Sequence, residues 1–245
     1  MSGDERALEA LSGVPAVLAA GELEPLGLLP GSSNATLLVR ARRGDDEALG
    51  VYKPVGGETP LWDFPDGTLA HREVAAFEVA RSLGWPHIPP TILRDGPYGP
   101  GAVQAFLEFD PEHHFFTLEQ ERADDFRRIA VFDLVANNAD RKSGHCRLGA
   151  DGRIWAIDHG VCFAEEPKLR TVIWGFVGEE IPEPLLGDLL RLERELAGGG
   201  LAATLAPLLL PVELEALRRR VADVRASATF PAPDPTTRPF PWPPI

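Results

Sequence analysis

The chain has 245 residues, of which 44% are hydrophobic, enough for one domain or for two lobes around a shared site. Asp and Glu outnumber Lys and Arg by 37 to 24, and the formal net charge of −13 disfavours nonspecific binding to nucleic acid or anionic lipid. No uninterrupted apolar run reaches the roughly 18 residues that span a bilayer. Because the acidic N-terminus does not resemble a signal peptide and only two cysteines occur, we expect a cytoplasmic protein with free thiols and no transmembrane segment.

The first part of the chain alternates apolar stretches with turn signals, which predicts antiparallel strands and one helix. The expected strands cover residues 22–29, 35–41, 48–53, 91–94 and 101–109. A helix is expected over Leu69–Leu83, with Thr68 as its N-cap and Gly84 as its stop.

The second part predicts a mainly helical unit. A helix that ends near Asn137 is followed by two short strands around an Asp-Gly turn at residues 150–153. Further helices are expected over residues 184–196, 201–209 and 212–226. The proline-rich tail, residues 231–245, should be extended and docked by Phe240 and Trp242, or else be a disordered end.

These elements predict an α+β fold with a strand-rich N-terminal lobe and a helical C-terminal lobe. The expected units are residues 1–109, residues 110–230 and the tail, residues 231–245.

A turn of small residues between two expected strands, Pro30–Asn34, is suited to close approach of phosphate oxygens, although an ordinary hairpin turn has the same composition. Lys53 ends the next expected strand. Helical spacing places Glu73 on the apolar face of the following helix, where a carboxylate is costly unless it is paired. Lys53 is the obvious partner, and such a pair orients a lysine toward nucleotide phosphates in kinase-type sites.

Charged, amide and imidazole groups are densest over residues 133–145, at a helix end that runs into a polar loop. Asp140 lies in this loop, and Asp158 follows the second strand of the next hairpin, so one hairpin can bring both carboxylates together. Paired acids suit phosphoryl transfer, in which one orients the acceptor and the other holds a divalent cation. The alternative is that both aspartates only stabilise turns.

A zinc site is a competing interpretation, because imidazole and thiolate are zinc ligands. Its ligands would be His145, Cys146, His159 and Cys162.

Six segments occur in an order that resembles the phosphoinositide 3- and 4-kinase superfamily, most closely the type II phosphatidylinositol 4-kinase branch and an uncharacterised actinobacterial family related to it. They are Gly31–Thr36, Val51–Lys53, Arg72–Glu73, Val103–Glu108, Asn138–Arg141 and Ala156–Gly160. The resemblance covers roughly residues 22–180 and implies a two-lobed, protein-kinase-like fold with ATP between the lobes. Residues 1–109 would carry the phosphate loop and hinge, and residues 110–230 would form the catalytic lobe.

The resemblance also implies roles for the residues that would bind the nucleotide. The phosphates would be covered by Ser32, Ser33 and Asn34 and contacted by Lys53, which Glu73 would hold. The adenine hinge would be lined by the segment from Gln104 to Glu108.

By the same resemblance, Asp140 would be the catalytic acid/base and Asp158 the metal ligand. We expect Lys142 to stabilise the transferring phosphoryl charge. His145 stands where these kinases usually offer an asparagine, and as a second metal ligand it would favour Mn²⁺ over Mg²⁺ and make activity fall below about pH 6.5. The alternative is that it only holds the loop in place.

The sequence therefore predicts an ATP-dependent phosphotransferase that uses Mg²⁺ or Mn²⁺. Its acceptor hydroxyl belongs to a protein, a small molecule or an inositol lipid, and nucleic acid is not an expected partner. Two alternatives are a nucleotide-binding regulator without catalysis and a kinase-like nucleotidyl transferase.

Overall fold

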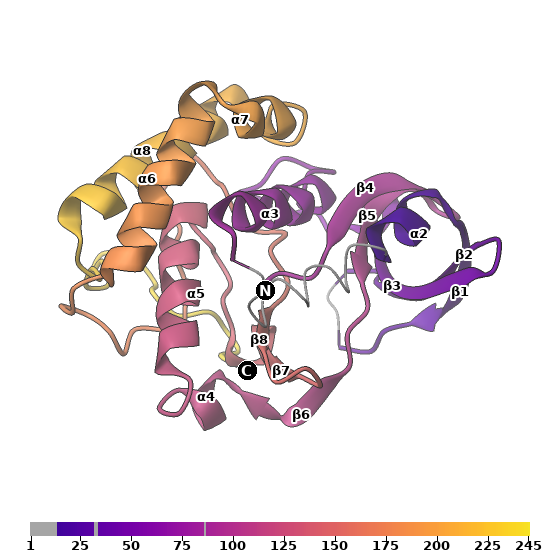
Figure 1. Ribbon diagram of the computed structural model, residues 1–245, viewed down its shortest axis with the longest axis horizontal. Helices are drawn as coiled ribbons and strands as arrows, with labels where there is room; N and C mark the ends of the chain where they lie inside the picture. The colour runs from indigo at the N-terminus through magenta and orange to yellow at the C-terminus, as the bar shows by residue number, and fades with distance from the viewer. Residues whose placement is uncertain (1–13, 32–33, 86) are drawn as a thin grey trace.

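The computed structural model describes residues 14–31, 34–85 and 87–245. A sheet-rich N-terminal part lies beside a helical C-terminal part, with the helix α3 between them (Figure 1). The expected α+β class with two such parts is confirmed. Within the described residues, the chain forms no helix that is both long and apolar enough to cross a membrane.

The N-terminal part is an antiparallel five-stranded sheet in the order β1-β2-β3-β5-β4. Its elements are α2 (Val14–Ala20), β1 (Glu22–Leu28), β2 (Leu37–Arg43), β3 (Asp46–Pro54), β4 (Thr91–Gly96) and β5 (Gly99–Ala105). Apolar side chains such as Val39, Tyr52 and Val103 alternate inward and pack under α2. At Gly101 a Cβ would lie 2.5 Å from the carbonyl oxygen of Lys53, so this glycine lets β5 approach β3 at the lysine.

The short 3-10 turn η1 (Val55–Gly57) leads through a loop to α3 (Leu69–Leu83), which has the expected bounds. Thr68 is the N-cap residue, as expected, but its side chain donates to the Pro65 carbonyl and makes no capping hydrogen bond. The carboxylate of Glu58 accepts hydrogen bonds from the Leu69 and Ala70 amides instead, at 3.2 and 2.8 Å. Gly84 ends the helix in the left-handed region, as expected.

The C-terminal part combines a small three-stranded sheet, β6-β7-β8, with packed helices. Its elements are β6 (Phe109–His114), α4 (Phe115–Leu118), α5 (Ala123–Ala136), η2 (Ser143–His145), β7 (Cys146–Gly149), β8 (Ile154–Ala156), α6 (Glu183–Gly198), α7 (Gly200–Leu205) and α8 (Pro211–Ser227). The strand expected over residues 101–109 ends at Ala105, and residues 106–108 connect the two sheets.

The buried face of α3 is divided between two hydrophobic clusters. Ala76, Val79 and Leu83 pack in one cluster with residues of α5, α6 and α8, whereas Ala70 and Val74 pack with Ala102 of β5 in another. A boundary at residue 109 between two lobes stays a prediction, and the helix that carries Glu73 packs on both the sheet and the helical part.

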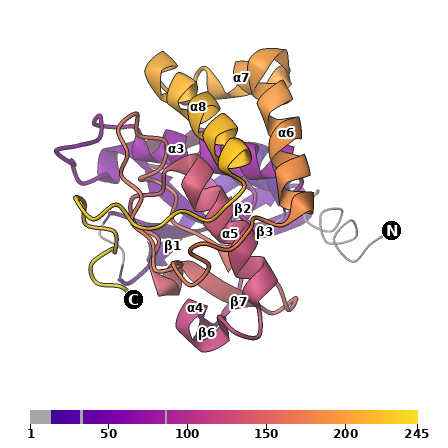
Figure 2. The same cartoon turned by 90° about the vertical axis from the view of Figure 1, so that its left-hand side faces the viewer.

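The proline-rich tail lies along the segment that follows β8, on the side of the molecule that Figure 2 shows. The Pro244 carbonyl accepts a hydrogen bond from the Ser143 amide at 2.9 Å, and the Pro239 carbonyl accepts from the Thr171 amide at 3.0 Å and from the Trp174 indole at 3.2 Å. The expected anchors are wrong, because Phe240 and Trp242 are 49% and 75% exposed. The tail is docked by its backbone, since proline carbonyls remain strong acceptors.

We expect deletion of residues 231–245 to lower the melting temperature by roughly 6–12 °C. Three hydrogen bonds worth about 1 kcal/mol each are lost, and a chain of this size loses about 2–4 °C per kcal/mol. Trp242→Ala is the matched control and should change the melting temperature by at most ~2 °C, because the indole is exposed. Thermal unfolding measures both, and an unchanged midpoint in the truncated protein would show that the tail does not dock.

Candidate active site

The ammonium group of Lys53 bridges two carboxylates from distant parts of the chain. It forms a short ion pair with Glu73 of α3 and lies 3.2 Å from Asp158 Oδ1, in the segment after β8. Burial alone would lower the pKa of Lys53, but the two negative charges outweigh it and raise the pKa above its ordinary value. The predicted pair of Lys53 with Glu73 is present. Asp158, 105 residues further along the chain than Lys53, also contacts the ammonium group.

Asp158 occupies a backbone conformation that suits few residues other than glycine. Its φ is 62°, in the left-handed region, and its side chain is 52% exposed. The Lys53 charge holds the pKa of Asp158 well below its usual range despite the opposing effect of burial. Backbone strain of this kind is concentrated at functional sites, and the result here is an accessible carboxylate whose pKa is lowered.

Asp140 lies in the loop after α5, and its carboxylate is one-third exposed. Lys142 Nζ is 3.4 Å from Asp140 Oδ2. Burial and the charge of Asp158 together raise the pKa of Asp140 to about 6, against the opposing effects of Lys142 and Arg141. Asp140 is thus a carboxylate that can exchange a proton near neutral pH, as a general base requires.

His145 connects the two aspartates. Its Nδ1 lies 2.9 Å from the Asp140 carbonyl oxygen, and its Nε2 lies 3.3 Å from Asp158 Oδ2. The contact with the carbonyl requires an N–H at Nδ1, because the alternative bond from the Lys142 amide is longer, at 3.4 Å. In that tautomer the lone pair of Nε2 faces the Asp158 carboxylate, an arrangement that favours a cation between them.

The expectation that His145 titrates near pH 6.5 is wrong. Burial lowers its pKa to about 4, against the opposing effect of the nearby Asp158 carboxylate. The ring is therefore neutral over the physiological range, and the group that titrates near pH 6 in this site is Asp140.

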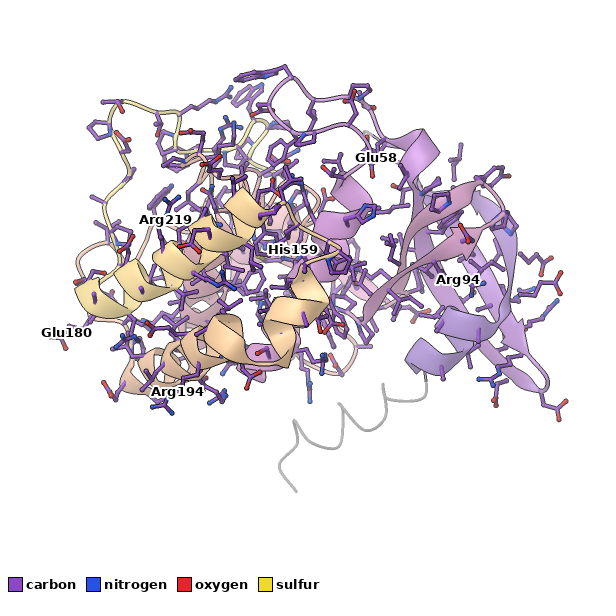
Figure 3. The ribbon with its side chains drawn as sticks, turned by 90° about the horizontal axis from the view of Figure 1, so that it is seen from above. Glu58, Arg94, His159, Glu180, Arg194 and Arg219 are labelled. Atoms are coloured by element: carbon purple, nitrogen blue, oxygen red, sulfur yellow. The ribbon has the colours of Figure 1, made fainter. Side chains whose placement is uncertain are left out.

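A buried network that the sequence did not reveal holds both aspartate loops. Arg141 donates two hydrogen bonds of 2.9 Å to Asp133 of α5, one of 3.0 Å to the Ile157 carbonyl and one of 2.7 Å to His159. All three side chains are buried, and His159 lies inside the helical part (Figure 3). The density of polar groups in residues 133–145 thus has a structural cause in addition to any chemical one.

Asn137 and Asn138 complete this scaffold. Asn138 donates to Asp133 and accepts from the Asp140 amide. Asn137, in the left-handed region at the end of α5, donates to the carbonyls of Ala164 and Glu166 and thereby shapes the segment after β8. The one sequence signal for this turn is the residue type, because asparagine has a short polar side chain that tolerates the left-handed conformation.

Among the other predicted nucleotide-binding residues, Asn34 and Gln104 form hydrogen bonds with residues other than Lys53. Ser32 and Ser33 lie outside the residues that the structure describes. Asn34 Oδ1 accepts from the Thr59 amide at 2.8 Å. Gln104 is buried and donates to Thr91 at 2.9 Å, while Glu108 is half-buried in the connection between the sheets. Their predicted roles toward phosphate and adenine stay predictions.

The zinc interpretation is wrong. Cys146 and Cys162 are buried free thiols, and burial raises the pKa of Cys146 to about 12 and that of Cys162 well above its ordinary value, so neither forms a thiolate readily. Among the described residues, no group of three or more histidine, cysteine, aspartate or glutamate side chains is arranged to hold a metal ion. A cation bound by the described residues would therefore need further ligands from a second molecule.

The fold is kinase-like. A solved structure, the Helicobacter pylori proinflammatory kinase CtkA, aligns with 86% of this chain and 94% of its own chain at a TM-score of 0.51 and 14% sequence identity. Shewanella oneidensis HipA, in its complex with HipB and operator DNA, aligns over 88% of this chain and 72% of that chain, at a TM-score of 0.47 and 13% identity.

Protein Rv2133c of Mycobacterium tuberculosis is 42% identical over 263 aligned positions, which cover 93% of this chain and 94% of that protein. The chain belongs to the same family as Rv2133c. No protein-family model matches the sequence.

We expect the Asp140 carboxyl carbon to titrate with a midpoint near pH 6 in the nucleotide-free protein. Because the Lys142 charge lowers this pKa, Lys142→Met should shift the midpoint upward. Carbon-13 NMR of labelled aspartate measures both, with Asp140→Asn to assign the resonance. A midpoint near the ordinary value of about 3.9 would contradict the burial of this group.

Proposed function

We propose that the protein is an ATP-dependent phosphotransferase. The observation that carries the proposal is the bridging position of Lys53, between Glu73 and the strained, exposed Asp158, with a second accessible carboxylate at Asp140 joined to the same cluster through His145. A kinase active site needs these groups, namely an oriented lysine for the phosphates, an acid for the metal and a base for the acceptor.

Within this proposal, Lys53 binds the nucleotide phosphates and Glu73 keeps its ammonium group oriented. Asp158 and the lone pair of His145 Nε2 fit a divalent cation, with the phosphate oxygens as its remaining ligands. When bound, Mg²⁺ or Mn²⁺ would neutralise the charge that the phosphates develop during transfer. Asn34, with Ser32 and Ser33, is proposed to cover the phosphates, and the segment from Gln104 to Glu108 is proposed to contact adenine.

Asp140 is proposed as the general base that accepts the proton of the acceptor hydroxyl, and its raised pKa supports that role. Lys142, beside it, is proposed to stabilise the transferred phosphoryl group. The ordered motifs that resemble phosphoinositide 3- and 4-kinases support the same assignment of roles, and the type II branch remains our proposal for the kinship. The acceptor is a hydroxyl of a protein, a small molecule or an inositol lipid.

We expect the isolated protein to bind ATP with Mg²⁺. Ligand at one hundred times its dissociation constant stabilises the folded state by about 2.7 kcal/mol, a shift that thermal unfolding detects easily. Asp158→Asn should weaken metal-dependent binding, whereas Asp140→Asn should bind ATP almost normally and lose transfer, because Asp140 addresses the acceptor.

Radiolabelled ATP and mass analysis of the products separate the alternatives. ADP with a phosphorylated acceptor supports the proposal, transfer of AMP indicates a nucleotidyl transferase, and binding without turnover indicates a regulator. If no nucleotide shifts the melting temperature with Mg²⁺ or Mn²⁺, the proposal is wrong.

We expect His145→Asn to shift the metal preference from Mn²⁺ toward Mg²⁺, because an amide oxygen replaces an imidazole nitrogen. The measurement is the ratio of ATP affinities in the two metals, for the wild type and the variant. An unchanged ratio would leave His145 only its structural role, the hydrogen bond to the Asp140 carbonyl.

A further inference from the structure

Arg72 lies next to Glu73 on α3 and is 1% exposed. Its guanidinium donates at 3.2 Å to Thr68, at 2.7 Å to the carbonyl of Cys162 and at 2.5 Å to Glu213 of α8. It also stacks over the Phe64 ring, 4.9 Å from the centroid. One side chain therefore joins α3, the segment after Asp158 and the first turn of α8.

Glu213 has two partners that occupy both of its oxygens. Oε1 accepts from Arg72, and Oε2 accepts from the Leu210 amide at 2.9 Å, which caps α8. The carboxylate is buried together with the guanidinium, so each ion depends on the other for compensation. The first turn of α8 and the guanidinium beside Glu73 are consequently fixed as one unit.

The opposite end of α3 is also fastened to the helical part. Arg191 of α6 donates to the Leu83 carbonyl at 2.8 Å, and the Trp85 indole donates to Asp188 of α6 at 2.7 Å. These contacts lie about three helical turns from Glu73. At the end of α3 that carries Glu73, the ion pair between Arg72 and Glu213 joins α3 to α8.

We propose that Arg72 and Glu213 are positioning residues for the Lys53–Glu73 pair, through which the start of α8 sets the affinity for the nucleotide phosphates. Arg72 holds the helix turn that presents the Glu73 carboxylate, and through the Cys162 carbonyl it also holds the segment that begins at Asp158. This proposal rests on the proposed function, since Lys53 is taken to bind phosphate.

The test is a double-mutant cycle on ATP·Mg²⁺ affinity, measured by calorimetry. Glu213→Ala should weaken binding about tenfold in the wild type and by less than about twofold in Glu73→Ala, because the effect passes through Glu73. Glu213→Gln should retain most of the affinity, since its amide oxygen still accepts from Arg72. Should Glu213→Ala fail to fold, the pair Arg72→Met with Glu213→Leu removes both buried charges and takes its place.

Glu193→Ala, on α6, is the matched control. It removes the 2.8 Å ion pair between Glu193 and Arg225 of α8, and Arg225 lies at the opposite end of α8 from Glu213. It should leave ATP affinity unchanged. Equal losses with and without Glu73, or a folded Glu213→Ala variant of normal affinity, would overturn the proposal.

Hydrogen exchange distinguishes failure of the positioning proposal from failure of the proposed function. If the wild type binds no nucleotide, the proposed function fails, and the coupling is then judged by amide exchange in residues 69–76. Faster exchange there in Glu213→Ala, but not in Glu193→Ala, supports the positioning role, and unchanged exchange overturns it.

Discussion

The buried ion pair between Arg141 and Asp133 holds the two halves of the candidate site together. A guanidinium with no access to water must be compensated on every side, and this one is bonded to α5, to the chain that leaves β8 and to His159. Burial alone would lower the pKa of Arg141, but the Asp133 charge outweighs it and raises the pKa. Asp140 and Asp158 are each next in sequence to a member of this network, so a structural pair sets the position of both accessible carboxylates.

The second constraint is the position of α3. Its buried face packs partly with α5, α6 and α8 and partly, through Ala70 and Val74, with Ala102 of β5. Lys53 belongs to β3 of the same sheet, so the Lys53–Glu73 pair joins that sheet to α3 and changes with any displacement of one relative to the other. Lys168 and Asp63, 3.0 Å apart, make a second connection between the loop before α3 and the segment after β8. Both ion pairs join segments that lie far apart in the sequence.

Local patterns were sufficient to predict most elements and the pair at Lys53. The bounds of α3 follow from helical spacing and from the left-handed Gly84, and Glu73 is recognisable as a carboxylate on an apolar face. The hairpin of β7 and β8 could likewise be predicted to bring Asp158 close to the loop of Asp140, because an Asp-Gly turn specifies a short return.

What could not be predicted depends on contacts between distant segments. Glu58 caps α3 from eleven residues before Leu69, and Arg72 pairs with Glu213, 141 residues further along the chain. The ordinary pKa of histidine suggested a titration near neutrality for His145, but the desolvation that lowers it comes from tertiary packing. The tail presents aromatic residues that suggested anchors, yet its carbonyls make the contacts. Composition and spacing carry no signal for any of these.

Two features of Asp140 favour catalysis over a purely regulatory role for the site. A carboxylate that only stabilises a turn is usually bonded to backbone amides, which lowers its pKa, as Asp110 illustrates on the surface. The Asp140 carboxylate instead lies 3.4 Å from a lysine, and burial raises its pKa to about 6. Keeping this group partly desolvated costs stability at neutral pH, because its ionised form is less favourable in the folded chain than in water. Groups with such a cost are concentrated at functional sites, which supports the proposed role of Asp140 as a general base.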